Sequence, residues 1–102
     1  MKFDIQTIFN KSRIAVLELR TSKGLSIVGA GEELAWRLAV AHKYPLTEVC
    51  RVTGRSEKDI KRDCASFSHR LLCAHPGATL TEQRRLFDQF NKEATTKELL
   101  NG

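Results

Sequence analysis

The sequence predicts a small α+β domain that is mostly helical, and three observations lead to this prediction. Apolar and polar residues partly alternate within residues 1–31, the apolar spacing becomes helical after Glu32, and helix-capping signals follow at Ser56 and Thr79. We therefore expect an N-terminal β-hairpin over residues 1–31, a tri-helical core over residues 32–74 and a C-terminal helix over residues 79–102. A chain of 102 residues suits one such domain.

The hairpin prediction rests on two alternating segments joined by a turn signal. The stretch Arg13–Arg20 is apolar and places Ile14 and Val16 on one face of a strand. Thr21–Gly24 is a typical turn sequence, and Leu25–Val28 alternates again. The preceding segment, residues 2–9, fits a further short strand and a helical turn equally well.

The central helix is expected from Glu32 onward. Glu32 and Glu33 suit the first turn of a helix because their charges complement the helix dipole. Leu34 and Leu38 share one face, while Trp36 covers another part of the surface. A helix that is apolar nearly all round belongs in the middle of a domain, so we expect Trp36 to lie in the core, and Phe67 likewise.

Three further helices are predicted from their boundary residues. Pro45 favours a helix over residues 46–53, which Gly54 ends. Ser56 is a good N-cap for a longer helix that reaches about Leu72. The sequence Thr79-Leu-Thr-Glu82 is a capping box for a C-terminal helix to about Glu93, whose apolar side contains Leu86, Phe87, Phe90 and Ala94.

The amino-acid composition limits the classes of function that the chain can have. The chain carries 17 Lys and Arg against 12 Asp and Glu, a net charge of +5, which is compatible with nucleic-acid binding. Its three cysteines are too few for a disulfide scaffold, and we expect neither a transmembrane helix nor a secretory signal. These features predict a cytoplasmic protein with no membrane contact.

The stretch from Pro45 to Cys64 has the layout of a helix-turn-helix. Such a unit needs a small side chain where its two helices cross, and Cys50 occupies that position. It also needs a turn residue with positive φ, here Gly54, and aliphatic residues that join the helices, here Val49 and Ile60. The match of four positions at fixed spacing predicts the motif more strongly than any one of them.

The segment Gly54–Asp63 resembles the recognition helix of helix-turn-helix transcription regulators. It is especially similar to winged-helix repressors of the DeoR type, whose segment has the pattern G-x-S-x-x-T-I-x-R-D, with Arg62-Asp63 at the R-D pair. The resemblance implies a winged-helix repressor that binds DNA. Arg55 stands where that family has an aliphatic residue, and a helix rather than a β-wing is expected after the third helix.

A helical projection from Ser56 separates an apolar face from a basic one. The apolar seam contains Ile60, Cys64, Phe67 and Leu71, and the opposite face contains Lys58, Lys61, Arg62, Ala65 and His69. Cationic side chains around a small residue suit a helix that lies in the major groove of DNA. We therefore predict a DNA-binding site made of Thr47, Arg55, Ser56, Lys58, Lys61 and Arg62.

Within this set, Arg62 and Lys58 are the candidates for base contacts. The remaining basic residues are expected to contact the phosphate backbone, as are Ser56 and Thr47 at helix starts. Because one recognition helix contacts only a few base pairs, a homodimer is expected. The edge of the hairpin and the apolar side of the C-terminal helix are the two candidate dimer surfaces.

Alternatives remain open at this stage. The tri-helical scaffold could serve a small protein-binding adaptor or inhibitor without DNA binding, and a basic face is often merely solvated. An RNA-binding hairpin would use Lys11, Arg13, Arg20 and Lys23, but its strands offer no aromatic residues for base stacking.

Metal and catalytic sites have little support in the sequence. Cys64, His69, Cys73 and His75 only loosely resemble zinc ligands because the usual paired spacing is missing, so buried free thiols are expected at Cys50 and Cys64. No catalytic motif is present, and we expect neither a cofactor nor an enzymatic activity.

Overall fold

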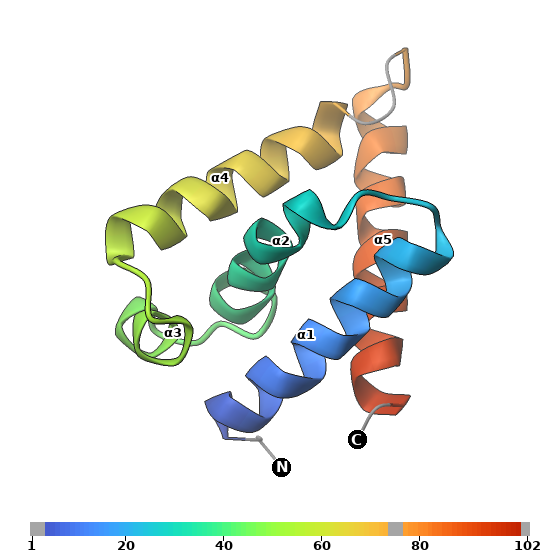
Figure 1. The fold of residues 1–102 in the computed structure, drawn as a ribbon. Coiled ribbons are helices and arrows are strands. Elements are labelled where there is room, and N and C mark those ends of the chain that lie inside the picture. Colours follow the sequence, from blue (N-terminus) through green and yellow to red (C-terminus); the bar gives the residue numbers. More distant parts are fainter. Residues whose placement is uncertain (1–3, 74–76, 101–102) are drawn as a thin grey trace.

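A computed structural model describes residues 4–73 and 77–100, and all regular structure in these residues is helical (Figure 1). The elements in chain order are α1 (Ile5–Ser22), η1 (Ile27–Gly29), α2 (Ala30–Trp36), η2 (Arg37–Ala41), α3 (Leu46–Thr53), α4 (Glu57–Cys73) and α5 (Leu80–Leu100). The predicted α+β class is therefore wrong, although a mostly helical chain was expected correctly.

The predicted N-terminal hairpin is instead the 18-residue helix α1. Its buried side chains include Ile5, Ile8, Ser12 and Leu19, whose spacing of three, four or seven residues is that of one helix face. The side chain of Asp4 caps the helix by accepting a hydrogen bond from the backbone N–H of Gln6 at 3.3 Å. The alternation in residues 13–20 was thus a short stretch of a helical pattern that begins earlier.

The predicted turn after this segment exists, but it ends a helix. Gly24 has a φ of +69°, and its backbone N–H donates to the carbonyl of Thr21 at 3.1 Å. The N–H of Leu25 donates to the carbonyl of Arg20 at 2.8 Å. This pair of bonds is a Schellman motif, which closes a helix with a left-handed glycine.

The centre of the domain is α2 together with the π-helical turn η2. In Figure 1 α2 lies between α1 and α4, and it packs against both. The main core cluster combines α1, α2, η2, α3 and α4 through Ile5, Ile8, Ala35, Leu38, Val49 and Ile60. The expected burial of Trp36 and Phe67 is confirmed, and their ring centroids lie 5.5 Å apart.

The C-terminal helix α5 begins at the predicted capping box. The Thr79 hydroxyl accepts a hydrogen bond from the Glu82 N–H, and the Glu82 carboxylate accepts one from the Thr79 N–H, each at 3.2 Å. The helix passes Glu93 and reaches Leu100, so it covers most of the predicted segment of residues 79–102. Its apolar side faces the rest of the chain, since the ring of Phe87 lies 5.0 Å from that of Trp36.

A buried polar cluster joins α5 to α1 and η2. The Arg37 guanidinium is 1% exposed and pairs with Glu98, while it also donates to Asn91 at 2.7 Å and Thr95 at 3.0 Å. Ser12 donates to Glu98 at 2.8 Å, and a ring nitrogen of His42 lies 2.8 Å from the same carboxylate. Because the partners come from three elements, this cluster fixes the position of α5.

The ionisation of Glu98 follows from these contacts. Burial alone raises the pKa of Glu98, but the hydrogen bonds from His42 and Arg37 outweigh it and lower the pKa to about 2. Glu98 therefore stays charged above this value, and its charge balances the buried guanidinium.

Among residues 4–73 and 77–100, no helix combines the length and the apolar character that crossing a membrane would require.

Candidate nucleic-acid interface

The α3–turn–α4 unit has the local geometry predicted for a helix-turn-helix. Gly54 follows α3 with a φ of +72°, in the left-handed region that favours glycine. Its N–H donates to the carbonyl of Cys50 at 2.9 Å and closes α3. Val49 and Ile60 are completely buried, so the two aliphatic residues hold α3 and α4 to the core as expected.

Ser56 begins α4 in the predicted way. Its hydroxyl accepts a hydrogen bond from the N–H of Asp59 at 3.2 Å, which satisfies one free donor of the first turn. The helix runs from Glu57 to Cys73, within one residue of the expected end. The next three positions, residues 74–76, lie outside the described residues.

The two faces of α4 agree with the helical projection. Ile60 and Phe67 are buried, and Cys64 is half-buried between them. The side chain of Leu71 lies outside the described residues. The five positions of the predicted basic face, Lys58, Lys61, Arg62, Ala65 and His69, are all exposed.

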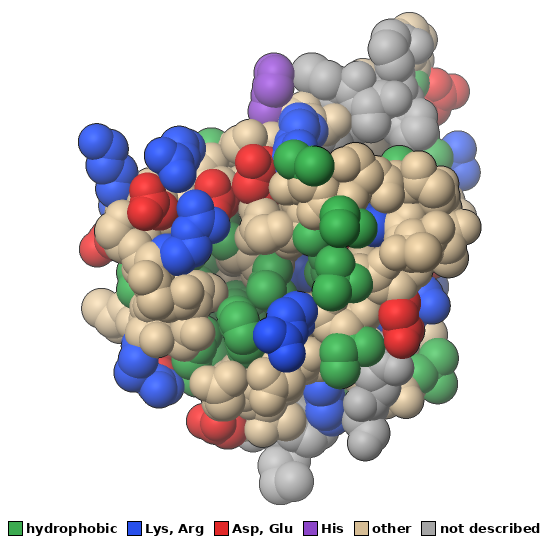
Figure 2. All heavy atoms as spheres, viewed as in Figure 1, with side chains coloured by type: hydrophobic (Ala, Val, Ile, Leu, Met, Phe, Trp, Pro, Cys, Tyr) green, Lys and Arg blue, Asp and Glu red, His purple; other side chains and the backbone are tan. Residues whose placement is uncertain are grey.

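Acidic side chains lie among these cations. Lys61 pairs with Glu57 at 3.2 Å, and Arg62 pairs with Asp59 at 3.2 Å. Both cations are 65% exposed. Lys58 forms no ion pair within the described part of the chain. Figure 2 shows Lys, Arg, Asp and Glu side chains intermixed over α3 and the start of α4.

Arg55 differs from the other predicted contacts. Its guanidinium is only 36% exposed and pairs with Asp63, a carboxylate that is 6% exposed. This ion pair compensates the buried charge of Asp63 and connects the turn to the second turn of α4.

Thr47 lies exposed in the first turn of α3. No side chain caps this helix start, because its N-cap residue is Pro45. The first turn thus leaves Thr47 accessible beside backbone N–H groups, on the unit that also contains Ser56 and Lys58.

The expectation for the two cysteines is met only in part. Cys50 and Cys64 are free but only half-buried, and burial together with the nearby Asp63 raises the pKa of the Cys64 thiol. Within the described ranges no three His, Cys, Asp or Glu side chains are placed to hold a metal ion. The Cys73 side chain and His75 lie outside the described residues.

One expectation tied to β-structure is wrong. The hairpin edge, one of the two candidate dimer surfaces, is missing from the described part of the chain, and Arg20 and Lys23 of the RNA-binding alternative belong to the end of α1. A β-wing, which the DeoR resemblance implies, was not expected from the sequence, and in the described residues α5 is the next element after α4.

Sequence reasoning missed three ion pairs with a buried carboxylate, which are Arg20–Glu33, Arg37–Glu98 and Arg55–Asp63. One signal was available for the second pair, because Arg37 stands between Trp36 and Leu38 in a helix predicted to be buried. No signal indicated its partner, which lies 61 residues away.

No protein-family model, no curated protein and no solved structure matches the chain.

Proposed function

We propose that the chain is a sequence-specific DNA-binding regulator of transcription. In this proposal α4 is the recognition helix, lies in the major groove and contacts bases through Lys58 and Arg62. Lys61 contacts the phosphate backbone, and Thr47 and Ser56 contact phosphates at the starts of α3 and α4. The protein acts in the cytoplasm as a homodimer, since two half-sites extend the few base pairs that one helix contacts.

One observation carries the proposal. The first half of α4 follows a left-handed glycine, has Ile60 buried on one side and exposes Lys58, Lys61 and Arg62 on the other. Long exposed cations on a helix whose opposite face is held by the core can reach phosphates and base edges without rearrangement of the fold.

The role of Arg55 is narrower in the proposal than the sequence indicated. Its guanidinium has five N–H donors, and the ion pair with Asp63 leaves some of them for a phosphate. Arg55 therefore holds the turn in place and contacts the DNA backbone only through its remaining donors.

A mobility-shift assay tests the proposal. The probes are a duplex from upstream of the gene that encodes the chain and a duplex of the same length with shuffled sequence. We expect tighter binding to the first duplex, and a Lys58→Ala/Arg62→Ala variant should bind it at least about tenfold more weakly. A Lys61→Ala variant, which loses a proposed phosphate contact, should bind both duplexes more weakly, and its logarithmic salt slope should decrease by about 0.9.

The matched control is the Arg84→Ala/Arg85→Ala variant. The two substitutions remove the same net charge from exposed positions on α5, outside the proposed DNA contacts. Equal losses in the two double variants would indicate nonspecific charge attraction and contradict the proposal.

The acids beside the cations favour one second candidate. Because Glu57 and Asp59 already pair with Lys61 and Arg62, this face could be simply solvated, as in a protein-binding adaptor on the same scaffold. An adaptor would bind neither duplex, and its binding to a partner would be insensitive to the Lys58 and Arg62 substitutions.

A further inference from the structure

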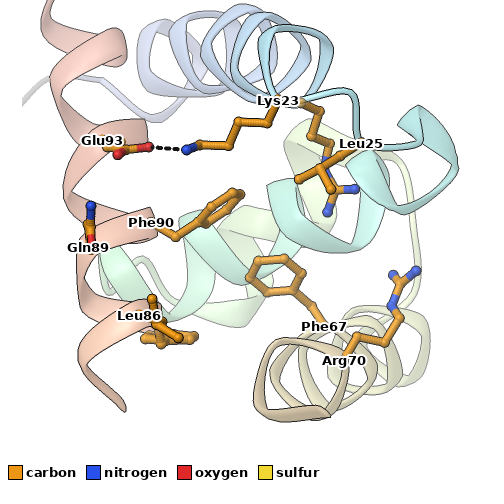
Figure 3. A pocket seen from close by; sticks show the side chains of 10 residues that line it. Lys23, Leu25, Phe67, Arg70, Leu86, Gln89, Phe90 and Glu93 are labelled. Atoms are coloured by element: carbon orange, nitrogen blue, oxygen red, sulfur yellow. Dashed lines mark ion pairs between the residues drawn. The ribbon is translucent and has the colours of Figure 1, made fainter. Parts of the chain in front are cut away.

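A cavity of about 660 Å³ lies between the end of α1, the second half of α4 and α5. This volume is within the range of small-molecule sites. The cavity is part of neither the proposed DNA contacts nor the buried Arg37–Glu98 cluster. Figure 3 shows Phe67 from α4 and Phe90 from α5 facing the same space.

The walls of the cavity are apolar, and several cations surround them. The aromatic and aliphatic lining consists of Leu25, Phe67, Leu86, Phe87 and Phe90. Three cations, Arg20, Lys23 and Arg70, also line the cavity, against one acid, Glu93. An apolar interior with partly exposed cationic side chains at its edge suits a molecule that has an apolar body and an anionic group.

Two of the cations, Arg20 and Arg70, come together from different elements. Gly29 is buried, and a Cβ atom on it would lie 2.9 Å from both terminal nitrogens of Arg70 and 3.1 Å from a terminal nitrogen of Arg20. A glycine at this position therefore makes room for two guanidinium groups side by side. Arg70 pairs with Glu32, and Arg20 pairs with Glu33 at 2.8 Å.

These ion pairs leave donors for a ligand. A guanidinium has five N–H donors and one carboxylate uses at most two of them. Arg70 is 47% exposed and Lys23 is 41% exposed, so both are accessible to an anion at the mouth. Lys23 is held by Glu93 at 3.0 Å, a contact that an incoming anion must compete with (Figure 3).

We propose that this cavity binds a small aromatic carboxylate, with its ring between Phe67 and Phe90 and its carboxylate at Arg70 and Lys23. Aromatic rings pack on aromatic walls in edge-to-face or offset geometry, and the ring of Phe87 in the cavity wall already packs edge-on against Trp36 at 5.0 Å. Since Phe67 and Arg70 belong to α4, the ligand contacts the proposed recognition helix. The statement that this helix is a recognition helix rests on the proposed function, whereas the binding of the ligand in the cavity does not.

Binding can be measured on the full chain without DNA. Trp36 is the single tryptophan, and its ring contacts Phe67 and Phe87 of the cavity wall, so its fluorescence reports occupancy. The probes are 4-phenylbutyrate, 4-phenylbutanol and 4-phenylbutylamine, which share one apolar body and differ in charge. We expect the carboxylate to bind at least about tenfold more tightly than the alcohol, and the amine to bind most weakly.

Three variants locate the binding site. Arg70→Met should reduce the affinity for 4-phenylbutyrate about tenfold, while Arg84→Met on the exposed side of α5 should leave it unchanged. Glu93→Gln should raise the affinity, because it frees Lys23 from its competing partner. If Arg70→Met alters the fold, as judged by circular dichroism, Lys23→Met makes the same test.

Several results would overturn the proposal. These are equal affinities for the carboxylate and the alcohol, a preference for the amine, no response to 4-phenylbutyrate, and an affinity that Arg70→Met and Arg84→Met change equally. The failure of DNA binding would leave all four measurements unaffected, so the two proposals can be refuted separately.

Discussion

Replacing Glu98 by glutamine tests the buried cluster that joins α5 to the rest of the domain. Glu98 is 4% exposed and neutralises Arg37, which is 1% exposed. Removing one member of a buried ion pair leaves an uncompensated charge and costs about 3–5 kcal/mol. Glutamine keeps part of the hydrogen bonding from Ser12, so we expect a loss near the lower value.

The lowered pKa of Glu98 gives a second measure of how much its charge contributes to the free energy of unfolding. Its folded value of about 2 lies below the ordinary value of 4.5, which corresponds to about 3 kcal/mol of stability. Because the folded pKa is the lower one, this contribution is present above the ordinary pKa and is lost as the pH falls from about 4.5 to about 2. The contacts of His42, Arg37 and Ser12 with the carboxylate lower this pKa and outweigh the effect of burial.

Urea unfolding followed by circular dichroism measures the effect. The free energy of unfolding of Glu98→Gln should lie about 3 kcal/mol below wild type at pH 6, and the difference should shrink below about 1 kcal/mol near pH 2. Glu93→Gln is the matched control, since its exposed pair with Lys23 should contribute less than about 1 kcal/mol. A difference that is the same at both pH values would refute the reasoning.

Three further predictions concern the turn at Gly54, the capping residue Thr79 and the Arg55–Asp63 ion pair. Gly54→Ala forces an alanine into a φ of +72° and should lower the unfolding free energy by about 1–2 kcal/mol; a neutral effect would argue against the left-handed turn. Thr79→Ala removes the capping hydroxyl of α5 and should cost about 1 kcal/mol in the same assay, with unchanged stability as the contrary result. Arg55→Met leaves the buried Asp63 without its main partner and should cost about 1–3 kcal/mol; a loss of DNA affinity with full stability would instead assign Arg55 to DNA contacts alone.

The helices from residue 46 onward could be predicted because local chemistry marks their ends. Gly54, Ser56 and the Thr79–Glu82 capping box each form the backbone interactions that their residue types favour. The buried and exposed faces of α4 could also be predicted from its spacing of apolar residues, because a 17-residue helix contains several repeats of the 3.6-residue period.

The first helix was missed because its buried face includes a polar residue. Ser12 is completely buried and donates to Glu98, so the core pattern looks interrupted in the sequence. Without that position, the short run around Ile14 and Val16 fits a strand as well as a helix. Gly24 was identified as a turn, but a left-handed glycine closes hairpins and helices alike.

The interior charges could not be predicted from local sequence. Asp63 and Glu98 look like surface residues until their partners, Arg55 and Arg37, are brought to them by the fold. The aromatic cavity depends in the same way on long-range contacts, since Phe67 and Phe90 come from different helices. Pairing across the chain is tertiary information that the spacing of residues within one helix does not contain.

The most direct test of the proposed function is to map amide chemical-shift changes while the chain is titrated with its preferred duplex. The largest changes are expected at residues 46–47 and 55–62, the starts of α3 and α4, with small changes over residues 80–100. Changes concentrated in α1 or α5, or no change at any DNA concentration up to the solubility limit, would contradict a recognition role for α4.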